Sequence, residues 1–143
     1  MPDAACGHKV AVQAATVQEA DVRARSTVCT KAGKPAIDVL AEQDGQVPFN
    51  DVITGKAQAA VSDLVVVTDI LDKTGGKLTK IGDSYGKAPF GFAVAKKDTA
   101  FAQAIATALN ELIADGTYPK LAQKWKVGDA AITTSEVNPA VTD

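Results

Sequence analysis

Apolar residues are distributed along this chain in two ways: as short continuous runs, and as longer segments in which they recur every three or four positions. The short runs predict buried strands, and the longer segments predict helices with one apolar face. Strands are expected at residues 9–13, 36–41, 57–61 and 78–81. Helices are expected at residues 16–25, 47–54 and 64–73. This βαβαβαβ order predicts an α/β fold with parallel strands joined by right-handed helical crossovers.

The clearest pattern lies in the C-terminal third of the chain. Residues 90–94 predict a strand, and Asp98 is a suitable N-cap for the helix that follows, because its carboxylate can accept the free amides of the first turn. The expected apolar face of this helix consists of Phe101, Ile105, Leu109, Leu112 and Ile113. Gly116 stands where the helix must stop, since Gly adopts the left-handed conformation without steric cost.

A second, shorter helix is expected directly after that glycine. Thr117 is its expected N-cap, and Pro119 is tolerated in its first turn. Leu121 and Trp125 are four residues apart and would form its buried side. No periodicity is present after Val127, so residues 128–143 predict an irregular tail that lies on the surface or pairs with another segment.

The composition is that of a folded domain. The chain has 143 residues, about one domain in length, and a hydrophobic content of 46% allows a core. With a net charge of −2 and interspersed acidic and basic residues, it has no basic patch for nucleic acid or a membrane surface. No apolar run approaches the roughly 18 residues of a bilayer span, so we expect no membrane insertion. Met1-Pro2-Asp3 leads directly into the domain, so no signal peptide is expected in this chain.

The sequence does not indicate an enzyme. His8 is the only histidine, and it stands at the start of a predicted strand, away from the end where ligands bind in such folds. No set of nucleophile, base and acid can be recognised, and neither a GxGxxG nor a Walker motif is present. We therefore expect no catalytic residues, no metal and no cofactor.

A binding site is expected beyond the carboxyl ends of the parallel strands. The first strand ends at Gln13, and Ala14, Ala15 and Thr16 lead into the next helix. Thr16 and Glu19 have the T-x-x-E spacing of a capping box. The amides and dipole of a helix N-terminus favour an anion such as a carboxylate. Thr16 is thus both a candidate cap and a candidate ligand-binding residue.

Several motifs together resemble the amino-acid-binding extracytoplasmic solute-binding proteins of ABC transporters, which have the type II periplasmic-binding-protein fold (family 3). The residues that carry the resemblance are Gly91–Val94, Lys97, Ala114–Tyr118, Lys120, Leu121, Lys124 and Trp125. They match a "yGiav.k" strand followed by a long helix and "adGTY.kl..kW" at the C-terminal end of those proteins. Including the alternation before them, the resemblance covers roughly Cys6 to Val127.

The resemblance implies one lobe of a two-lobed protein. It predicts a three-layer, flavodoxin-like α/β lobe at residues 6–127, with a mainly parallel sheet and one antiparallel strand. Residues 6–86 would be the second lobe, and residues 87–127 would be the crossover strand and C-terminal helices. We expect the first lobe to be absent from this sequence. We expect the strand at 90–94 to insert antiparallel beside the third strand, in a compact monomer or in a swapped homodimer with its hinge at 84–89.

The resemblance also implies ligand-binding residues. Gln13, Ala15 and Thr16 match the family pattern "Q.GT.QE", in which the threonine hydroxyl and amide meet the ligand carboxylate. Ala15 departs from the usual glycine, and its methyl group would crowd the ligand or restrict the turn. Asp63 matches a carboxylate that pairs with the ligand α-ammonium, and its alternative role is the N-cap of the third helix.

The two cysteines, Cys6 and Cys29, allow two interpretations. Taken alone, they are compatible with two buried free thiols. Relatives with a "CG..VAVQ" start and a second cysteine after the first helix imply a Cys6–Cys29 disulfide, formed in an oxidising compartment.

The resulting hypothesis is a ligand-binding lobe that delivers an amino acid to an ABC importer outside the cytoplasm. Its partners would be the amino acid, the missing first lobe and the permease, and we expect the chain alone to be weak or inactive in binding. One alternative is a free-standing or engineered flavodoxin-like module without a ligand. Another is a fragment of a cyclohexadienyl-dehydratase-like enzyme, whose catalytic acid and carboxylate-binding arginine would belong to the missing lobe.

Overall fold

The computed structural model describes residues 3–86 and 90–139. They form two compact units, the first ending at Tyr85 and the second beginning at Gly86. Residues 87–89, part of the hinge predicted at 84–89, lie outside the described residues. The single lobe predicted for residues 6–127 remains a prediction.

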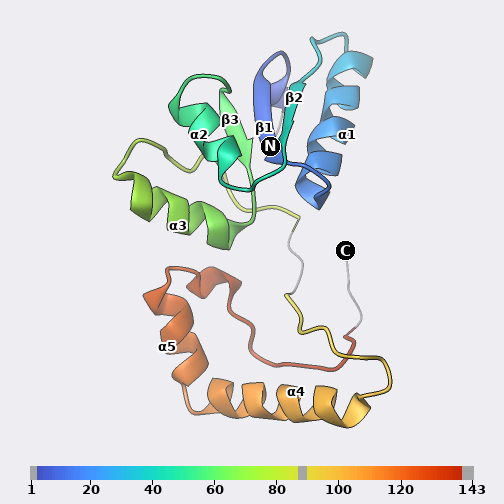
Figure 1. The fold of residues 1–143 in the computed structure, drawn as a ribbon, viewed down its shortest axis with the longest axis vertical. Helices are drawn as coiled ribbons and strands as arrows, with labels where there is room; N and C mark the ends of the chain where they lie inside the picture. The colour runs from blue at the N-terminus through green and yellow to red at the C-terminus, as the bar shows by residue number, and fades with distance from the viewer. Residues whose placement is uncertain (1–2, 87–89, 140–143) are drawn as a thin grey trace. The chain divides into compact units, whose positions relative to one another are not determined.

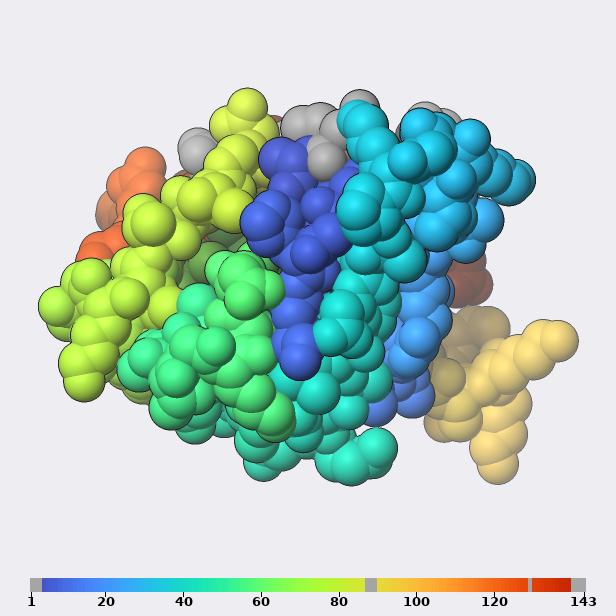
Figure 2. Space-filling model, turned by 90° about the horizontal axis from the view of Figure 1, so that it is seen from above, coloured from blue at the N-terminus to red at the C-terminus, as the bar shows by residue number. Residues whose placement is uncertain are grey.

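The first unit is built on a three-stranded sheet in which every pair of neighbours is parallel. Its strands are β1 (Lys9–Gln13), β2 (Asp38–Glu42) and β3 (Ala59–Val61). The order is β2-β1-β3, with Ala11 aligned with Leu40 on one side and with Ala60 on the other. In the space-filling view of Figure 2, the blue N-terminal residues lie between cyan and green segments, in keeping with this order.

Helices cover both faces of this sheet, which confirms the predicted three-layer α/β architecture. The helices of the first unit are α1 (Val17–Lys31), α2 (Val47–Ile53) and α3 (Leu64–Thr74), preceded by a 3-10 turn, η1 (Asp3–Ala5). Figure 1 shows α1 and α2 on opposite sides of the strands. Val10 and Val12 are fully buried in one cluster with Val22 of α1. Because side chains alternate across a strand, Ala11 faces the other layer.

Helix α1 is longer than its sequence pattern predicts, reaching Lys31 rather than residue 25. Its second half contains Ser26-Thr27-Val28, a run of poor helix formers. Tertiary contacts stabilise this half, because the Ser26 hydroxyl donates to Ile37 O at 3.1 Å and accepts from Ile37 N at 2.9 Å. Both bonds tie α1 to the start of β2, so the helix continues where its local propensity is low.

The strand predicted at 78–81 is wrong, since these residues have no strand pairing. Gly76 and Gly82, on either side, both have positive φ and turn the backbone. Ile81 is 69% exposed, so burial supplies little free energy for a ladder there.

The second unit contains two helices and a short 3-10 turn: α4 (Thr99–Ala114), α5 (Thr117–Lys124) and η2 (Gly128–Ala130). Gly116 has a φ of 81°, as predicted for the end of α4. Asp98 lies at the N-cap of α4, but its side chain makes no capping hydrogen bond. Thr117 is the first helical residue of α5 rather than its N-cap. The Thr117 amide donates to Asp115 Oδ1 at 2.8 Å, and this bond lowers the pKa of Asp115.

The predicted strand at 90–94 is also wrong, and with it the antiparallel strand expected in the sheet. Within the described residues, the sheet consists of three parallel strands, and residues 90–94 are irregular. Phe90 and Phe92 are 77% and 74% exposed. A strand requires a ladder partner for its backbone amides and carbonyls, and the apolar alternation of these residues cannot supply one by itself.

Residues 131–139, the described part of the tail beyond η2, contain no helix or strand and are held on the helices of their own unit. Asn110 of α4 donates from Nδ2 to Ser135 O at 3.0 Å and accepts from Ser135 N at 2.8 Å. The Tyr118 hydroxyl of α5 accepts a hydrogen bond from Ile132 N at 3.2 Å. These side-chain bonds replace the regular ladder that the tail lacks.

Candidate functional site

A pocket of about 220 Å³ lies at the carboxyl ends of the strands, where the fold class predicts a ligand site. It is lined by Gln13, Thr16, Gln18, Gly45, Gln46, Val61, Ser62, Asp63 and Val66. Three of the four predicted ligand-binding residues, namely Gln13, Thr16 and Asp63, are among them. They come from the ends of β1 and β3 and the start of α1, so parallel topology brings together residues some fifty positions apart.

Thr16 forms the predicted cap of α1. Its hydroxyl accepts a hydrogen bond from Glu19 N at 3.2 Å and donates to Gln13 O at 2.7 Å. A hydroxyl has one proton to donate, and here Gln13 O takes it. Any ligand carboxylate at this end of α1 therefore depends on backbone amides rather than on the Thr16 hydroxyl in this geometry.

In a capping box, the glutamate side chain accepts a hydrogen bond from the amide of the N-cap residue. Glu19 instead accepts from the amide of the residue before the N-cap. Its Oε2 accepts from Ala15 N at 2.7 Å, and its Oε1 pairs with Arg23. The Ala15 amide bond, followed by the Arg23 bond, lowers the pKa of Glu19. The N-terminus of α1 thus already carries a carboxylate, which offsets part of the helix dipole.

Ala15 has a φ of 58°, in the left-handed region that favours glycine. For an L-residue this conformation costs roughly 1–2 kcal/mol. Ala15 is not among the pocket-lining residues. Of the two consequences expected from replacing glycine here, the structure thus supports a restricted turn rather than a crowded ligand.

Asp63 occupies the N-cap position of α3, yet its side chain makes no capping hydrogen bond. Its Oδ1 instead accepts from Gln18 Nε2 at 2.8 Å. The carboxylate is therefore directed to the pocket side rather than to the first turn of α3. Asp63 thus stands at the N-cap position without the side-chain hydrogen bond that the capping alternative requires.

Sequence reasoning did not identify Gln18, Gly45, Gln46 or Ser62 as pocket residues. Gly45 lies against Gln13, because a Cβ added to it would stand 2.9 Å from Gln13 Oε1. Their positions could have identified three of these residues, because residues that follow a parallel strand lie at the end of the sheet where ligands bind. Gly45 and Gln46 lie in the loop after β2, and Ser62 immediately follows β3. For Gln18 the signal was the family pattern "Q.GT.QE", whose second Q falls on this position.

The lining combines polar side chains with two valines, and it carries a single charge. Asp63 is its only ionisable group, and the other polar side chains are three carboxamides and two hydroxyls. Such a lining can pair with an ammonium and accept or donate further hydrogen bonds. It lacks a guanidinium or ammonium to hold a carboxylate.

A second polar cluster lies outside the pocket lining. The Tyr85 hydroxyl donates to Asp21 Oδ2 at 3.1 Å, and Arg25 lies 4.7 Å from the Tyr85 ring centroid. Burial, followed by the negative charge of Asp21, raises the pKa of Tyr85. Both partners lie on α1, so this cluster fixes the last residue of the first unit against that helix.

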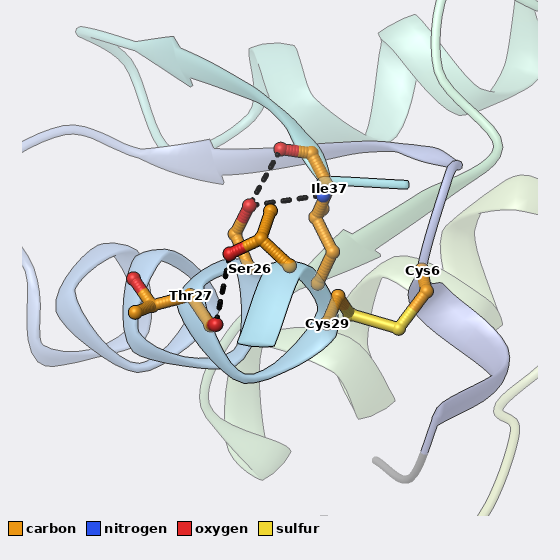
Figure 3. The surroundings of a disulfide bond; sticks show 6 residues. Cys6, Ser26, Thr27, Cys29 and Ile37 are labelled. Carbon is orange, nitrogen blue, oxygen red and sulfur yellow. Dashed lines mark hydrogen bonds between the residues drawn. A yellow bond between two sulfur atoms is a disulfide. The ribbon is translucent and has the colours of Figure 1, made fainter. Parts of the chain in front are cut away.

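The disulfide implied by the resemblance is confirmed. Cys6 and Cys29 are bonded, with their Cα atoms 5.6 Å apart and a sequence separation of 23 positions. Figure 3 shows the bond joining the segment before β1 to the last turns of α1, close to Ser26 and Ile37. The cross-link and the Ser26 bonds together fix the end of α1.

Neither a metal centre nor a membrane span is found in the part of the chain that the structure describes. There, no three side chains of His, Cys, Asp or Glu are grouped so as to hold a metal ion. Among the same residues, each helix is too short or too polar to cross a membrane.

Comparison with known proteins gives relatives of one kind, although no family model matches the chain. The arginine-binding protein ArgT of Corynebacterium glutamicum is 33% identical over 138 residues, which are 96% of this chain and 45% of ArgT. The L-cystine-binding protein TcyJ of Escherichia coli K12 is 27% identical over 89 residues, 62% of this chain and 34% of TcyJ.

A solved structure agrees with these relatives. An ancestral arginine-binding protein bound to arginine matches with a TM-score of 0.68 and 28% identity, over 86% of this chain and 52% of that one. This chain spans less than half the length of the curated relatives it matches. By sequence and by fold, it is a relative of amino-acid solute-binding proteins, similar to about half of such a protein.

Proposed function

We propose that this chain is the ligand-binding lobe of a solute-binding protein that delivers an amino acid to an ABC importer. The observation that carries the proposal is Asp63, a carboxylate at the N-cap of α3 that lines the pocket and does not cap its helix. In this role Asp63 pairs with the α-ammonium of the ligand by a charge-assisted hydrogen bond.

The opposite side of the pocket receives the ligand carboxylate. The amides at the start of α1 supply donors and the positive end of a helix dipole. Thr16 orders this turn through its cap, and Gln13 adds a carboxamide from the end of β1. Ala15 contributes the backbone of the same turn, so the four predicted residues act together in the proposal.

Binding by the chain alone is weak in this proposal. Its pocket lining carries no cation to hold the carboxylate bidentately. In the parent protein, the first lobe would close over the ligand, and the closed form would be presented to the permease. An extracytoplasmic location suits the Cys6–Cys29 disulfide, because disulfides persist in oxidising compartments.

The second unit suggests how an isolated chain would behave. Its exposed apolar side chains include Phe90, Phe92 and Phe101. In the parent protein the missing lobe would cover such residues. In isolation the chain would either be a monomer that leaves them exposed or a swapped homodimer in which a second copy covers them. Light scattering over a range of concentrations tests this, and a constant monomer mass would count against the dimer.

Calorimetric titration with each of the twenty amino acids tests the binding proposal. Arginine is the first to examine, because two of the relatives are arginine-binding proteins. We expect binding weaker than micromolar. Asp63→Asn should reduce the binding free energy by a further roughly 1.5–3 kcal/mol, because a charged hydrogen-bond acceptor is removed. Unchanged affinity in Asp63→Asn would return Asp63 to a purely structural role.

A further inference from the structure

The carboxylate of Asp63 is held by a side chain that is distant in sequence. An aspartate at an N-cap ordinarily accepts a backbone amide of the first helical turn. Asp63 has the extended backbone of an N-cap, and its carbonyl accepts from Val67 N at 2.9 Å. Its side chain, however, accepts from Gln18 Nε2, 45 residues earlier in the chain.

The start of α1 places Gln18 accurately for this contact. Thr16 caps the helix, and Glu19 bonds to Ala15 N and to Arg23. The first turn that carries Gln18 is thereby fixed on both sides of it. Its side chain reaches from α1 to the junction of β3 and α3, and both Gln18 and Asp63 line the pocket.

The chemistry of a carboxamide matters at this point. A lysine or arginine in place of Gln18 would neutralise Asp63, whereas a carboxamide donates a hydrogen bond and leaves the negative charge intact. A carboxylate has acceptor sites on both oxygens, so a bond to Oδ1 still leaves capacity for a ligand ammonium. Binding groups are most effective when neighbouring side chains hold them in place.

We propose that Gln18 is a positioning residue, which holds the Asp63 carboxylate toward the pocket so that it can receive the ammonium group of the ligand. This inference rests on the proposed amino-acid-binding function. The start of α1 would then have two roles. Its backbone amides donate to the ligand carboxylate, and Gln18 holds the Asp63 carboxylate.

The first test needs no ligand. In NMR spectra of the ¹⁵N-labelled chain, Asp63→Ala should move the side-chain amide signals of Gln18 toward those of a free glutamine. Gln43→Ala, a change of an exposed carboxamide in the β2–α2 loop, should leave the Gln18 signals in place. Gln18 signals that do not respond to Asp63→Ala would overturn the contact and the proposal with it.

The second test separates positioning from direct binding. L-arginine and its analogue without the α-amino group, 5-guanidinopentanoate, are titrated into the chain and followed by NMR, which detects millimolar binding. Gln18→Met keeps the length of the side chain and removes the donor. We expect it to weaken L-arginine binding about tenfold and to leave the analogue unaffected.

The double variant completes the design. If Gln18 acts through Asp63, Gln18→Met should have no further effect on L-arginine binding in an Asp63→Ala background. An equal loss for both probes, or a loss that persists without Asp63, would show that Gln18 acts on the ligand directly and would overturn the positioning role. Failure of the unmodified chain to bind L-arginine or any other amino acid would overturn the proposed function, while the ligand-free spectra still report on the contact.

Discussion

The two units of this chain use similar residues with very different results. In the first unit, Val10, Val12 and Val22 are almost completely buried between the sheet and α1. In the second unit, Phe101 and Trp125 are 61% and 65% exposed, although their spacing predicts buried helix faces. Apolar periodicity therefore indicates which face of a helix must be covered by other residues. Only in the first unit do residues of the same unit cover that face.

The largest expected effect is the loss of stability when the disulfide is reduced, because this bond cross-links the first unit alone. Reduction of the Cys6–Cys29 bond should lower the free energy of unfolding of that unit by about 3 kcal/mol, because the open loop has more conformational entropy when unfolded. Denaturant unfolding followed by circular dichroism, with and without reductant, measures the change.

Trp125 allows the second unit to be followed separately, since it is the only tryptophan in the chain. Its fluorescence transition should be unchanged by reductant if the two units unfold independently. The double variant Cys6→Ser/Cys29→Ser should match the reduced chain and be insensitive to reductant. A fluorescence transition that moves together with the circular dichroism would contradict the separation of the two units.

A matched pair of truncations compares the packing of the two units. Val22→Ala should destabilise the first unit by about 2 kcal/mol, because it leaves a cavity in the fully buried cluster around β1. Leu112→Ala, in the exposed part of α4, should cost less than about 1 kcal/mol. Thermal unfolding measures both. Equal losses would mean that Leu112 is buried in solution, for example against a second copy.

The well-packed first unit still contains local strain at Ala15. Ala15→Gly should stabilise it by about 1 kcal/mol, since glycine adopts the observed positive φ without steric cost. Ala24→Gly, at an exposed position within α1, should destabilise the same unit by roughly 0.5–1 kcal/mol. Chemical denaturation of both variants provides the measurement, and the same sign in both would rule out strain at Ala15.

The smallest expected effect concerns pH, and it too belongs to the first unit. The amide of Ala15 lowers the pKa of Glu19 in the folded chain below its ordinary value of 4.5. The stability that ionised Glu19 contributes is therefore fully present above the ordinary pKa of 4.5, and it is lost as the pH falls through the lower pKa of the folded chain. Glu19→Gln should flatten the stability profile in this acidic range only. A change of slope near neutral pH would contradict this origin.

Local sequence was sufficient for most of the helices. The expected helices 47–54 and 64–73 agree with α2 and α3 to within one residue at each end. Gly116 ends α4 as predicted, because a left-handed residue is a local requirement that glycine meets by itself. The parallel direction of the strands and a site beyond their carboxyl ends also followed from the alternation of elements.

Tertiary structure decided the features that depend on a distant partner. The second half of α1 exists because Ser26 and Cys29 bind residues outside the helix, which no helix propensity records. Residues 90–94 have the alternation of a strand and form none, since a ladder needs hydrogen-bonding groups from another segment.

The site shows the same division. The sequence by itself was enough to place Thr16 at a helix start and Asp63 after a strand, because both positions follow from local order along the chain. It could not show that the Asp63 carboxylate turns away from its own helix and accepts from Gln18. That choice depends on where α1 and the β3–α3 junction meet in space, and a hydrogen bond between side chains 45 residues apart exists only once the sheet has brought its strand ends together.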